Sequence, residues 1–141
     1  KILGEIISSR IENNRELKIS STCTRVPVID GHSAVVHINF RDKIPIKDEI
    51  IRIWGNYKGE VHDLELPSSP SSPIIYNQNE DRPQVKMDVN NGNGMTVTIG
   101  RLEKDTFFDY KFIGLSHNTI RGAAGGAILM AELLVKKGYI K

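Results

Sequence analysis

The stretch Thr24-Arg25-Val26-Pro27-Val28-Ile29-Asp30-Gly31-His32 organises the rest of this chain. It carries a guanidinium and an imidazole seven residues apart, with a short apolar run between them. Pro27 lacks the N–H that a central strand position needs, and the Asp30-Gly31 pair supplies turn chemistry. We therefore predict a strand that runs into a tight turn, with His32 at the point where a strand breaks or restarts.

Arg25 and His32 have the side chains that a site for an anionic substrate needs. The planar guanidinium matches a carboxylate or a phosphate, and the imidazole can transfer a proton near neutral pH. The alternative is a surface or structural histidine that follows a turn, and the spacing alone does not decide between the two.

Length and composition indicate one domain with an ordinary core. The chain has 141 residues, with 19 Lys plus Arg against 17 Asp plus Glu and a net charge of +2. This near balance argues against a nucleic-acid or membrane partner. The longest apolar stretch, residues 122–135, contains Glu132 and is shorter than the roughly 20 residues of a membrane span. The single cysteine fits a reducing compartment, so we expect a cytoplasmic protein.

The first half of the chain predicts two helices and two strands. Apolar residues recur at helical spacing over residues 2–14 and again over residues 46–54, where acids fill the first turn. The second helix should end around Gly55 or Gly59. β-branched residues predict strands at 17–23 and 34–40.

The second half predicts a surface loop, a hairpin, a strand and a last helix. Residues 65–83 have the composition of a flexible linker, but we favour an ordered loop with a short strand at 74–76. Alternation predicts hairpin strands at 84–90 and 95–99, then a strand at 107–115 and a helix over 119–139. The order predicts an α+β domain with a mostly antiparallel sheet covered by helices.

The last helix begins with an unusually narrow turn. Asn118 or Thr119 can cap it, and residues 121–126 are mostly Gly and Ala. Small side chains allow a flat ligand to approach the helix start, or allow the helix to pack closely on the sheet, and both interpretations remain open. The apolar stripe of this helix consists of Ile120, Ala123, Ala124, Ala127, Ile128, Ala131 and Leu134.

Other candidate residues are weaker. We interpret Cys23 as a small buried hydrophobe and not as a reactive thiol. The remaining histidines, His37, His62 and His117, lack metal-ligand spacing, so no metal site is predicted.

Several runs of the chain resemble one family in order and spacing, the archaeal and fungal-type aspartate-semialdehyde dehydrogenases, in their C-terminal part. The runs that carry the resemblance are Cys23-Thr24-Arg25-Val26-Pro27-Val28-Ile29-Asp30-Gly31-His32, Asp81-Arg82-Pro83-Gln84, Gly92-Asn93-Gly94-Met95-Thr96-Val97, Gly100-Arg101-Leu102 and Leu115-Ser116-His117-Asn118-Thr119-Ile120-Arg121-Gly122-Ala123-Ala124-Gly125-Gly126. The resemblance implies a glyceraldehyde-3-phosphate-dehydrogenase-like C-terminal domain that takes part in catalysis and dimerisation.

The resemblance also implies an activity and site residues. The family interconverts L-aspartate 4-semialdehyde and L-4-aspartyl phosphate with NADP and phosphate, in the biosynthesis of lysine, threonine and methionine. Arg25 matches the arginine that grips the substrate carboxylate, and His32 matches the acid/base histidine. The turn before the last helix faces the nicotinamide in the family, which implies cofactor contacts at Asn118 and Gly122. Arg101 is as well explained by a structural ion pair as by a ligand contact.

Two parts of the family's machinery have no counterpart in these residues. The nucleophilic cysteine of the family lies upstream, and Cys23 does not match it. No strand followed by Gly-x-Gly-x-x-Gly opens a helix here. We therefore expect residues 1–141 to be a C-terminal catalytic and dimerisation fragment that is inactive alone, because NADP is bound mainly by a missing N-terminal domain. An apolar helical pattern that already runs at the first residue agrees with a fragment.

The expected partners are the small substrates, the N-terminal NADP-binding domain and a second copy of the chain. The final helix, about residues 119–138, should pack toward the missing domain. Two alternatives remain: a fragment of malonyl-CoA reductase, which shares the architecture but uses a different acyl donor, and a stand-alone dimerisation domain with a degenerate pocket.

Overall fold

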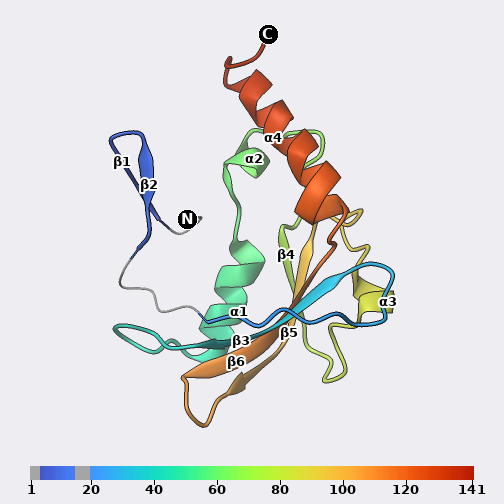
Figure 1. Cartoon of the computed structure of the whole chain (residues 1–141). Helices are drawn as coiled ribbons and strands as arrows, with labels where there is room; N and C mark the ends of the chain where they lie inside the picture. The colour runs from blue at the N-terminus through green and yellow to red at the C-terminus, as the bar shows by residue number, and fades with distance from the viewer. Residues whose placement is uncertain (1–3, 15–19) are drawn as a thin grey trace.

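Four strands form the central sheet of the computed structural model, which describes residues 4–14 and 20–141 (Figure 1). They are β3 (His32–Ile38), β4 (Ile74–Asn77), β5 (Val97–Lys104) and β6 (Tyr110–Ser116), in the order β3-β6-β5-β4. β6 pairs antiparallel with β3 and with β5, whereas β4 and β5 are parallel. The predicted α+β fold and its mostly antiparallel sheet are confirmed.

Helix α1 (Lys47–Asn56) covers one face of the sheet at the Tyr110 end of β6. Its buried Ile50 contacts the fully buried Leu102 and Tyr110, and Trp54 stacks on Tyr76. The predicted helix at 46–54 is therefore confirmed. It ends at Asn56 with Tyr57 as its C-cap, between the two glycines that were expected to close it.

A second core joins the last helix to residues 61–66 and to Met95. The π-helical turn η1 (Ile120–Ala124) leads into α4 (Gly125–Lys136), which rises from one end of the sheet beside the short α2 (Glu60–Asp63) (Figure 1). The side chains of this core are Val61, Leu64, Leu66, Met95, Ile120, Leu129 and Leu133. The last helix confirms the prediction for residues 119–139, whereas α2 was not predicted.

The predicted helix at residues 2–14 is wrong. Its described part is a hairpin of β1 (Glu5–Ile7) and β2 (Arg10–Glu12), which lies away from the sheet (Figure 1). Ser8 and Ser9 both have positive φ and form the connecting turn. The β-branched isoleucines of this segment suit either structure, and the turn decides for the hairpin. Residues 1–3, and 17–19 of the predicted strand at 17–23, lie outside the described residues, while residues 20–23 have no regular structure.

The predicted hairpin of residues 84–90 and 95–99 is also wrong. Residues 85–88 form the short helix α3 (Val85–Asp88), and β5 pairs with β4 and β6. The strand predictions at 34–40, 74–76 and 107–115 correspond to β3, β4 and β6.

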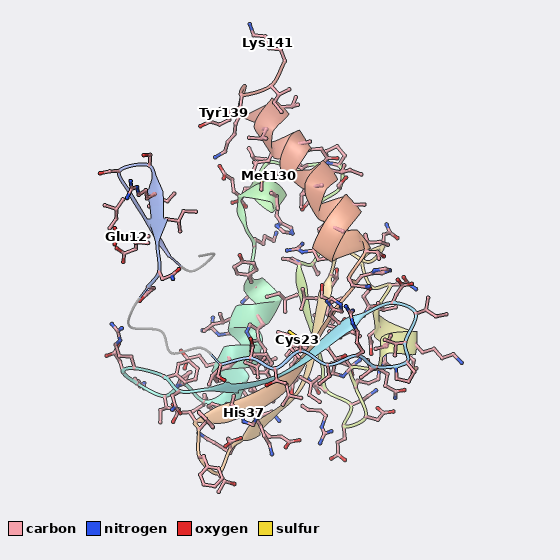
Figure 2. All side chains as sticks on the ribbon, viewed as in Figure 1. Glu12, Cys23, His37, Met130, Tyr139 and Lys141 are labelled. Atoms are coloured by element: carbon pink, nitrogen blue, oxygen red, sulfur yellow. The ribbon has the colours of Figure 1, made fainter. Side chains whose placement is uncertain are left out.

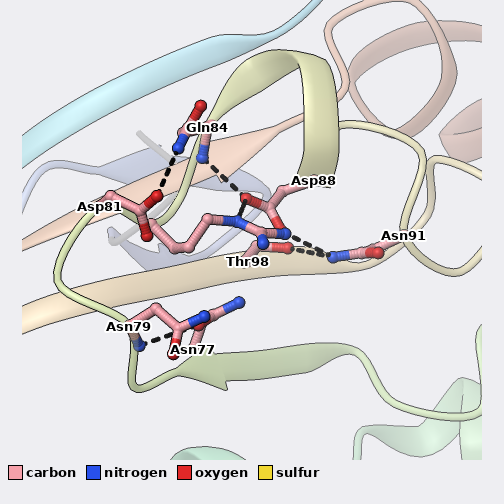
Figure 3. Close-up of polar contacts among 8 residues, drawn as sticks. Asn77, Asn79, Asp81, Gln84, Asp88, Asn91 and Thr98 are labelled. Carbon is pink, nitrogen blue, oxygen red and sulfur yellow. Dashed lines mark hydrogen bonds and ion pairs between the residues drawn. The ribbon is translucent and has the colours of Figure 1, made fainter.

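A buried ion pair explains why residues 85–88 are helical. The Asp88 carboxylate, 1% exposed, accepts hydrogen bonds from Arg82 and from the Gln84 backbone N–H at 2.7 Å (Figure 3). Asn91 links this group to β5 by donating to Thr98 Oγ1 at 2.9 Å. The Arg82 guanidinium lowers the pKa of the Asp88 carboxyl, although burial acts in the opposite direction. The segment that alternation assigned to a strand is therefore fixed as a helix by side-chain contacts within residues 82–98.

Replacing Asp88 with Asn should lower the free energy of unfolding by roughly 2 kcal/mol, because the partly buried Arg82 guanidinium loses its charged partner. Since the folded-state pKa of Asp88 is lowered, its contribution is complete above about pH 4 and is lost as the pH falls through that lower value. Urea denaturation of wild type and D88N at several pH values checks both points. The control is Asp81→Asn, which removes an exposed hydrogen bond with Gln84 and a weaker charge interaction with Arg82 but leaves the Arg82–Asp88 hydrogen bonds in place. Equal losses in the two variants would contradict the account.

Candidate functional site

His32 stands at the open end of one sheet face. It begins β3 and pairs in register with Ser116, the last residue of β6, and its side chain is exposed. The register places it on the same face as Gly114 and Tyr110. α1 covers Tyr110 on that face, but a Cβ added at Gly114 would meet nothing within 4 Å. The face beside His32 therefore has room for a ligand or another domain.

Gly31 fixes the turn that precedes His32. Its φ is +101°, and an added Cβ would lie 3.0 Å from Val85 Cγ1 and 3.3 Å from Leu115 Cδ1. A side chain here would be strained by the backbone and crowded by α3 and β6. The predicted break at Asp30-Gly31 is confirmed.

Asn118 ties this turn to the chain that leaves β6. Its Oδ1 accepts a hydrogen bond of 2.7 Å from the Gly31 N–H, across 87 positions of sequence. Thr119 adds a 3.4 Å hydrogen bond from its hydroxyl to the Asp30 carboxylate. No described residue accepts a hydrogen bond from Asn118 Nδ2, so its two hydrogens are available to a ligand. The structure therefore brings together two of the predicted site residues, His32 and Asn118.

Neither predicted cap closes the start of the last helix. The ring of His117, 5% exposed, accepts hydrogen bonds at Nδ1 from the backbone N–H groups of Thr119 and Ile120, both at 3.3 Å. Asn118 is bonded to Gly31 instead, and Thr119 makes no side-chain cap. The signal in the sequence was a polar residue three positions before the first helical residue, Ile120, where a histidine is not an expected cap.

The small residues after Thr119 divide between two roles. A Cβ added to Gly125 would lie 2.6 Å from Met95 Sδ, and one added to Gly126 would lie 2.6 Å from the Arg121 carbonyl oxygen. These two glycines therefore allow close packing. Gly122 is exposed, and its N–H donates to the His117 carbonyl at 3.0 Å. The members of the predicted apolar stripe that remain exposed are Ala123, Ala124, Ala127, Ile128 and Ala131.

Arg25 is exposed in the irregular segment that precedes β3. None of the described residues forms a hydrogen bond or an ion pair with it, so the structure does not join it to His32. Cys23, labelled in Figure 2, belongs to the same segment and is exposed. The prediction of a buried Cys23 is wrong, because residues 20–26 do not enter the sheet.

Two other candidates contact carboxylates. Arg101 has a φ of +54° at an irregularity of β5, and its Nε lies 3.7 Å from Glu103 Oε1. His37 Nδ1 lies 2.8 Å from Asp105 Oδ2. The backbone N–H of Phe107, with smaller contributions from Phe108 and His37, lowers the pKa of Asp105 to about 2 against the opposing effect of burial.

The sheet face opposite His32 contains a shallow hollow of about 240 Å³. Val35 and Ile113 contribute apolar lining, while Arg101, Glu103 and Lys111 contribute charges of both signs. Among residues 4–14 and 20–141, no three His, Cys, Asp or Glu side chains come together as a metal site. No helix in this part of the chain has the length and apolar character to cross a membrane.

Comparison with known proteins assigns the chain to a family. The sequence profile described as "Semialdehyde dehydrogenase, dimerisation domain" matches residues 1–121. The chain belongs to this family. It is 42% identical over 140 residues to the aspartate-semialdehyde dehydrogenase of Archaeoglobus fulgidus, covering 99% of this chain and 39% of that protein. It is also 42% identical over 143 residues to the malonyl CoA reductase (NADP) of Metallosphaera sedula, covering 99% and 40%.

Solved structures give the same assignment. The aspartate-semialdehyde dehydrogenase of Candida albicans, solved with NADP, superposes with a TM-score of 0.88 at 36% identity, over 99% of this chain and 40% of that one. Aspartate-semialdehyde dehydrogenase II of Vibrio cholerae, solved in complex with ASA, gives a TM-score of 0.61 at 25% identity, over 79% of this chain and 29% of that one. This semialdehyde dehydrogenase domain thus spans about two fifths of the curated relatives' length. The resemblance and fold stated from the sequence are confirmed, and the roles of Arg25, His32, Asn118 and Gly122 stay predictions.

Replacing Gly31 with Ala should lower the free energy of unfolding by about 1–3 kcal/mol, because the left-handed backbone is strained and Val85 is crowded. Gly114→Ala is the matched control in the neighbouring strand, where the added methyl group meets open space. Urea denaturation of both variants gives the comparison. An equal loss in G114A, or none in G31A, would show that the turn is not constrained in this way.

Proposed function

We propose that the intact protein containing this chain is an aspartate-semialdehyde dehydrogenase, which acts in the biosynthesis of lysine, threonine and methionine. It interconverts L-aspartate 4-semialdehyde and L-4-aspartyl phosphate with NADP and phosphate, in the cytoplasm. The observation that supports the proposal most directly is the hydrogen bond from the Gly31 N–H to Asn118 Oδ1, because it joins the residue before the acid/base candidate His32 to the cofactor candidate Asn118. The names of the relatives from Archaeoglobus and Candida support it.

Arg25 binds the carboxylate of the substrate, and His32 moves the proton. The exposed Arg25 has no competing carboxylate among the described residues, so its planar fork of donors is available to a substrate carboxylate. His32 takes a proton from a thiol nucleophile or returns one to the substrate oxygen, since an imidazole does both near neutral pH. The thiol belongs to a cysteine outside residues 1–141, which makes this domain inactive alone.

NADP fits the residues at the start of the last helix. It supplies or accepts the hydride when bound. Asn118 Nδ2 has no partner among the described residues and can donate a hydrogen bond to the carboxamide oxygen of a nicotinamide. The exposed Gly122 has no side chain to obstruct the nicotinamide ring. The exposed stripe on α4, with Ile128 54% exposed, then packs on the N-terminal domain that holds most of the cofactor.

A second copy of the chain covers the hollow on the opposite sheet face. The family description names a dimerisation domain, and Val35 and Ile113 contribute apolar lining to this hollow. The hollow also carries Arg101 and Lys111 beside Glu103, so two copies related by a two-fold axis bring opposite charges together.

The relative from Metallosphaera supports a second candidate, because its identity to this chain is as high as that of the dehydrogenases. In that case the acyl donor is a coenzyme A thioester. The run from Arg25 to His32 resembles the semialdehyde enzymes more closely, which favours the first candidate. NADPH oxidation by the intact enzyme with aspartyl phosphate, and then with malonyl-CoA, separates the two. Activity only with the thioester would replace the first proposal by the second.

His32→Asn should lower kcat by roughly 10²–10⁴-fold in the intact enzyme, because the proton has no acceptor at the correct position. The measurement is NADPH formation from aspartate semialdehyde and phosphate. His37→Asn is the matched control, since His37 lies on the same strand but on the opposite face. Unchanged turnover in H32N would remove the acid/base role.

Val35→Asp should dissociate the homodimer, because it places a desolvated charge in the hollow. Sedimentation velocity of the intact protein measures the change. Ile46→Asp is the matched control, because Ile46 and Val35 are both 68% exposed and Ile46 is the N-cap of α1, where an acid is favourable. Dimers that persist in V35D would show that the copies associate through another surface.

A further inference from the structure

The buried residue His117 contacts the turn that carries Asn118 and Gly122, and both Gly94 and the turn before His32 lie close to it. Its Nδ1 accepts hydrogen bonds from the N–H groups of Thr119 and Ile120, and these amides have no partner inside the helix that follows. Since Nδ1 accepts, the proton of the neutral ring is on Nε2. The His117 carbonyl accepts the N–H of Gly122 at 3.0 Å. One residue therefore holds both ends of the turn that carries Asn118 and Gly122.

The turn at residues 92–95 also lies against the ring of His117. Gly94 has a φ of +78°, and a Cβ added to it would lie 3.0 Å from His117 Cδ2 and 2.8 Å from Ile120 Cδ1. Only a glycine fits between this turn and the ring without displacing one of them. The imidazole is thus held by packing against Gly94 as well as by its hydrogen bonds to the start of the helix.

The same contacts extend to the turn that precedes His32. Asn118 follows His117 directly and accepts the Gly31 N–H, and Thr119 Oγ1 lies 3.3 Å from His117 Nδ1 and 3.4 Å from Asp30 Oδ1. A displacement of the capped turn would therefore move both Asn118 and the support of His32.

We infer that His117 is a positioning residue, which acts as a neutral hydrogen-bond acceptor to hold the cofactor-facing turn and the His32 turn in one arrangement. It touches neither substrate nor cofactor. The inference rests on the proposed function for its kinetic consequences, but its structural part stands on the contacts of His117 alone.

Two substitutions that differ in where they place an acceptor test the inference. Asn places its Oδ1 near the position of Nδ1, whereas the longer Gln places its amide near Nε2. In the intact enzyme, His117→Gln should raise the KM for NADPH and lower kcat, each roughly fivefold or more, the size expected when a helix cap is lost. His117→Asn should restore both values to near wild type. Equal defects in H117N and H117Q would overturn the inference.

Hydrogen exchange measured by mass spectrometry supplies a readout that needs no activity. In H117Q, peptides covering residues 29–34 and 118–124 should both exchange faster, while α1 (Lys47–Asn56) keeps its wild-type rate and excludes global unfolding. H117N should behave as wild type in all three. Faster exchange confined to residues 118–124, or faster exchange in α1 as well, would contradict the coupling to His32. If the exchange pattern holds and the wild-type enzyme has no NADP-linked activity, the proposed function fails and the positioning role remains.

Discussion

The hydrogen bond from the Gly31 N–H to Asn118 Oδ1 is the contact on which the arrangement of the site depends. It joins the turn that starts β3 to the turn that ends β6, and these are neighbours only because the two strands pair antiparallel. Gly31 is required there by its backbone and by the closeness of Val85, and Asn118 uses one half of its amide and leaves the other half for a ligand. The sheet thus supplies the proximity, and this one contact supplies the orientation.

The two faces of the sheet have different proposed roles, catalysis on the His32 face and dimerisation on the opposite face. On the His32 face, α1 covers the end near Tyr110, and a Cβ added at Gly114 would meet no atom of the described residues within 4 Å. On the opposite face, α3 and the Arg82–Asp88 pair cover the end near Thr98, and the hollow around Val35 stays open for association. Both proposed roles are therefore assigned to the end of the face that lies away from these clusters.

Much of this fold could be predicted from local pattern. The β-branched run at 34–40, the acids at the start of α1 and the Asp30-Gly31 turn are local signals that the structure bears out, whereas residues 20–23 of the β-branched run at 17–23 have no regular structure. The errors arose where the pattern suits two structures. The isoleucines of residues 2–14 fit a helix or a hairpin until Ser8 and Ser9 turn the chain, and the alternation of residues 84–90 fits a strand until Asp88 binds Arg82. The parallel pairing of β4 with β5 is non-local and has no signature in either strand.

The candidate site was less accessible to sequence reasoning. The spacing identified Arg25 and His32 as residues that could bind and protonate an anionic substrate, but it gave no other part of the site. Only the resemblance to a family linked them to Asn118 and Gly122. Neither identified His117, because its role depends on packing against Gly94 and on a cap that histidine rarely provides. Tertiary contacts of this kind carry no periodicity and no motif spacing.

A crystal structure of the intact protein with bound NADP tests the central claim most directly. The account predicts that Asn118 Oδ1 keeps its hydrogen bond to the Gly31 N–H while Nδ2 donates to the nicotinamide carboxamide at about 3 Å, with His32 facing the same cavity. An Asn118 side chain that has left Gly31 to hold the cofactor, or a nicotinamide bound away from this turn, would contradict it.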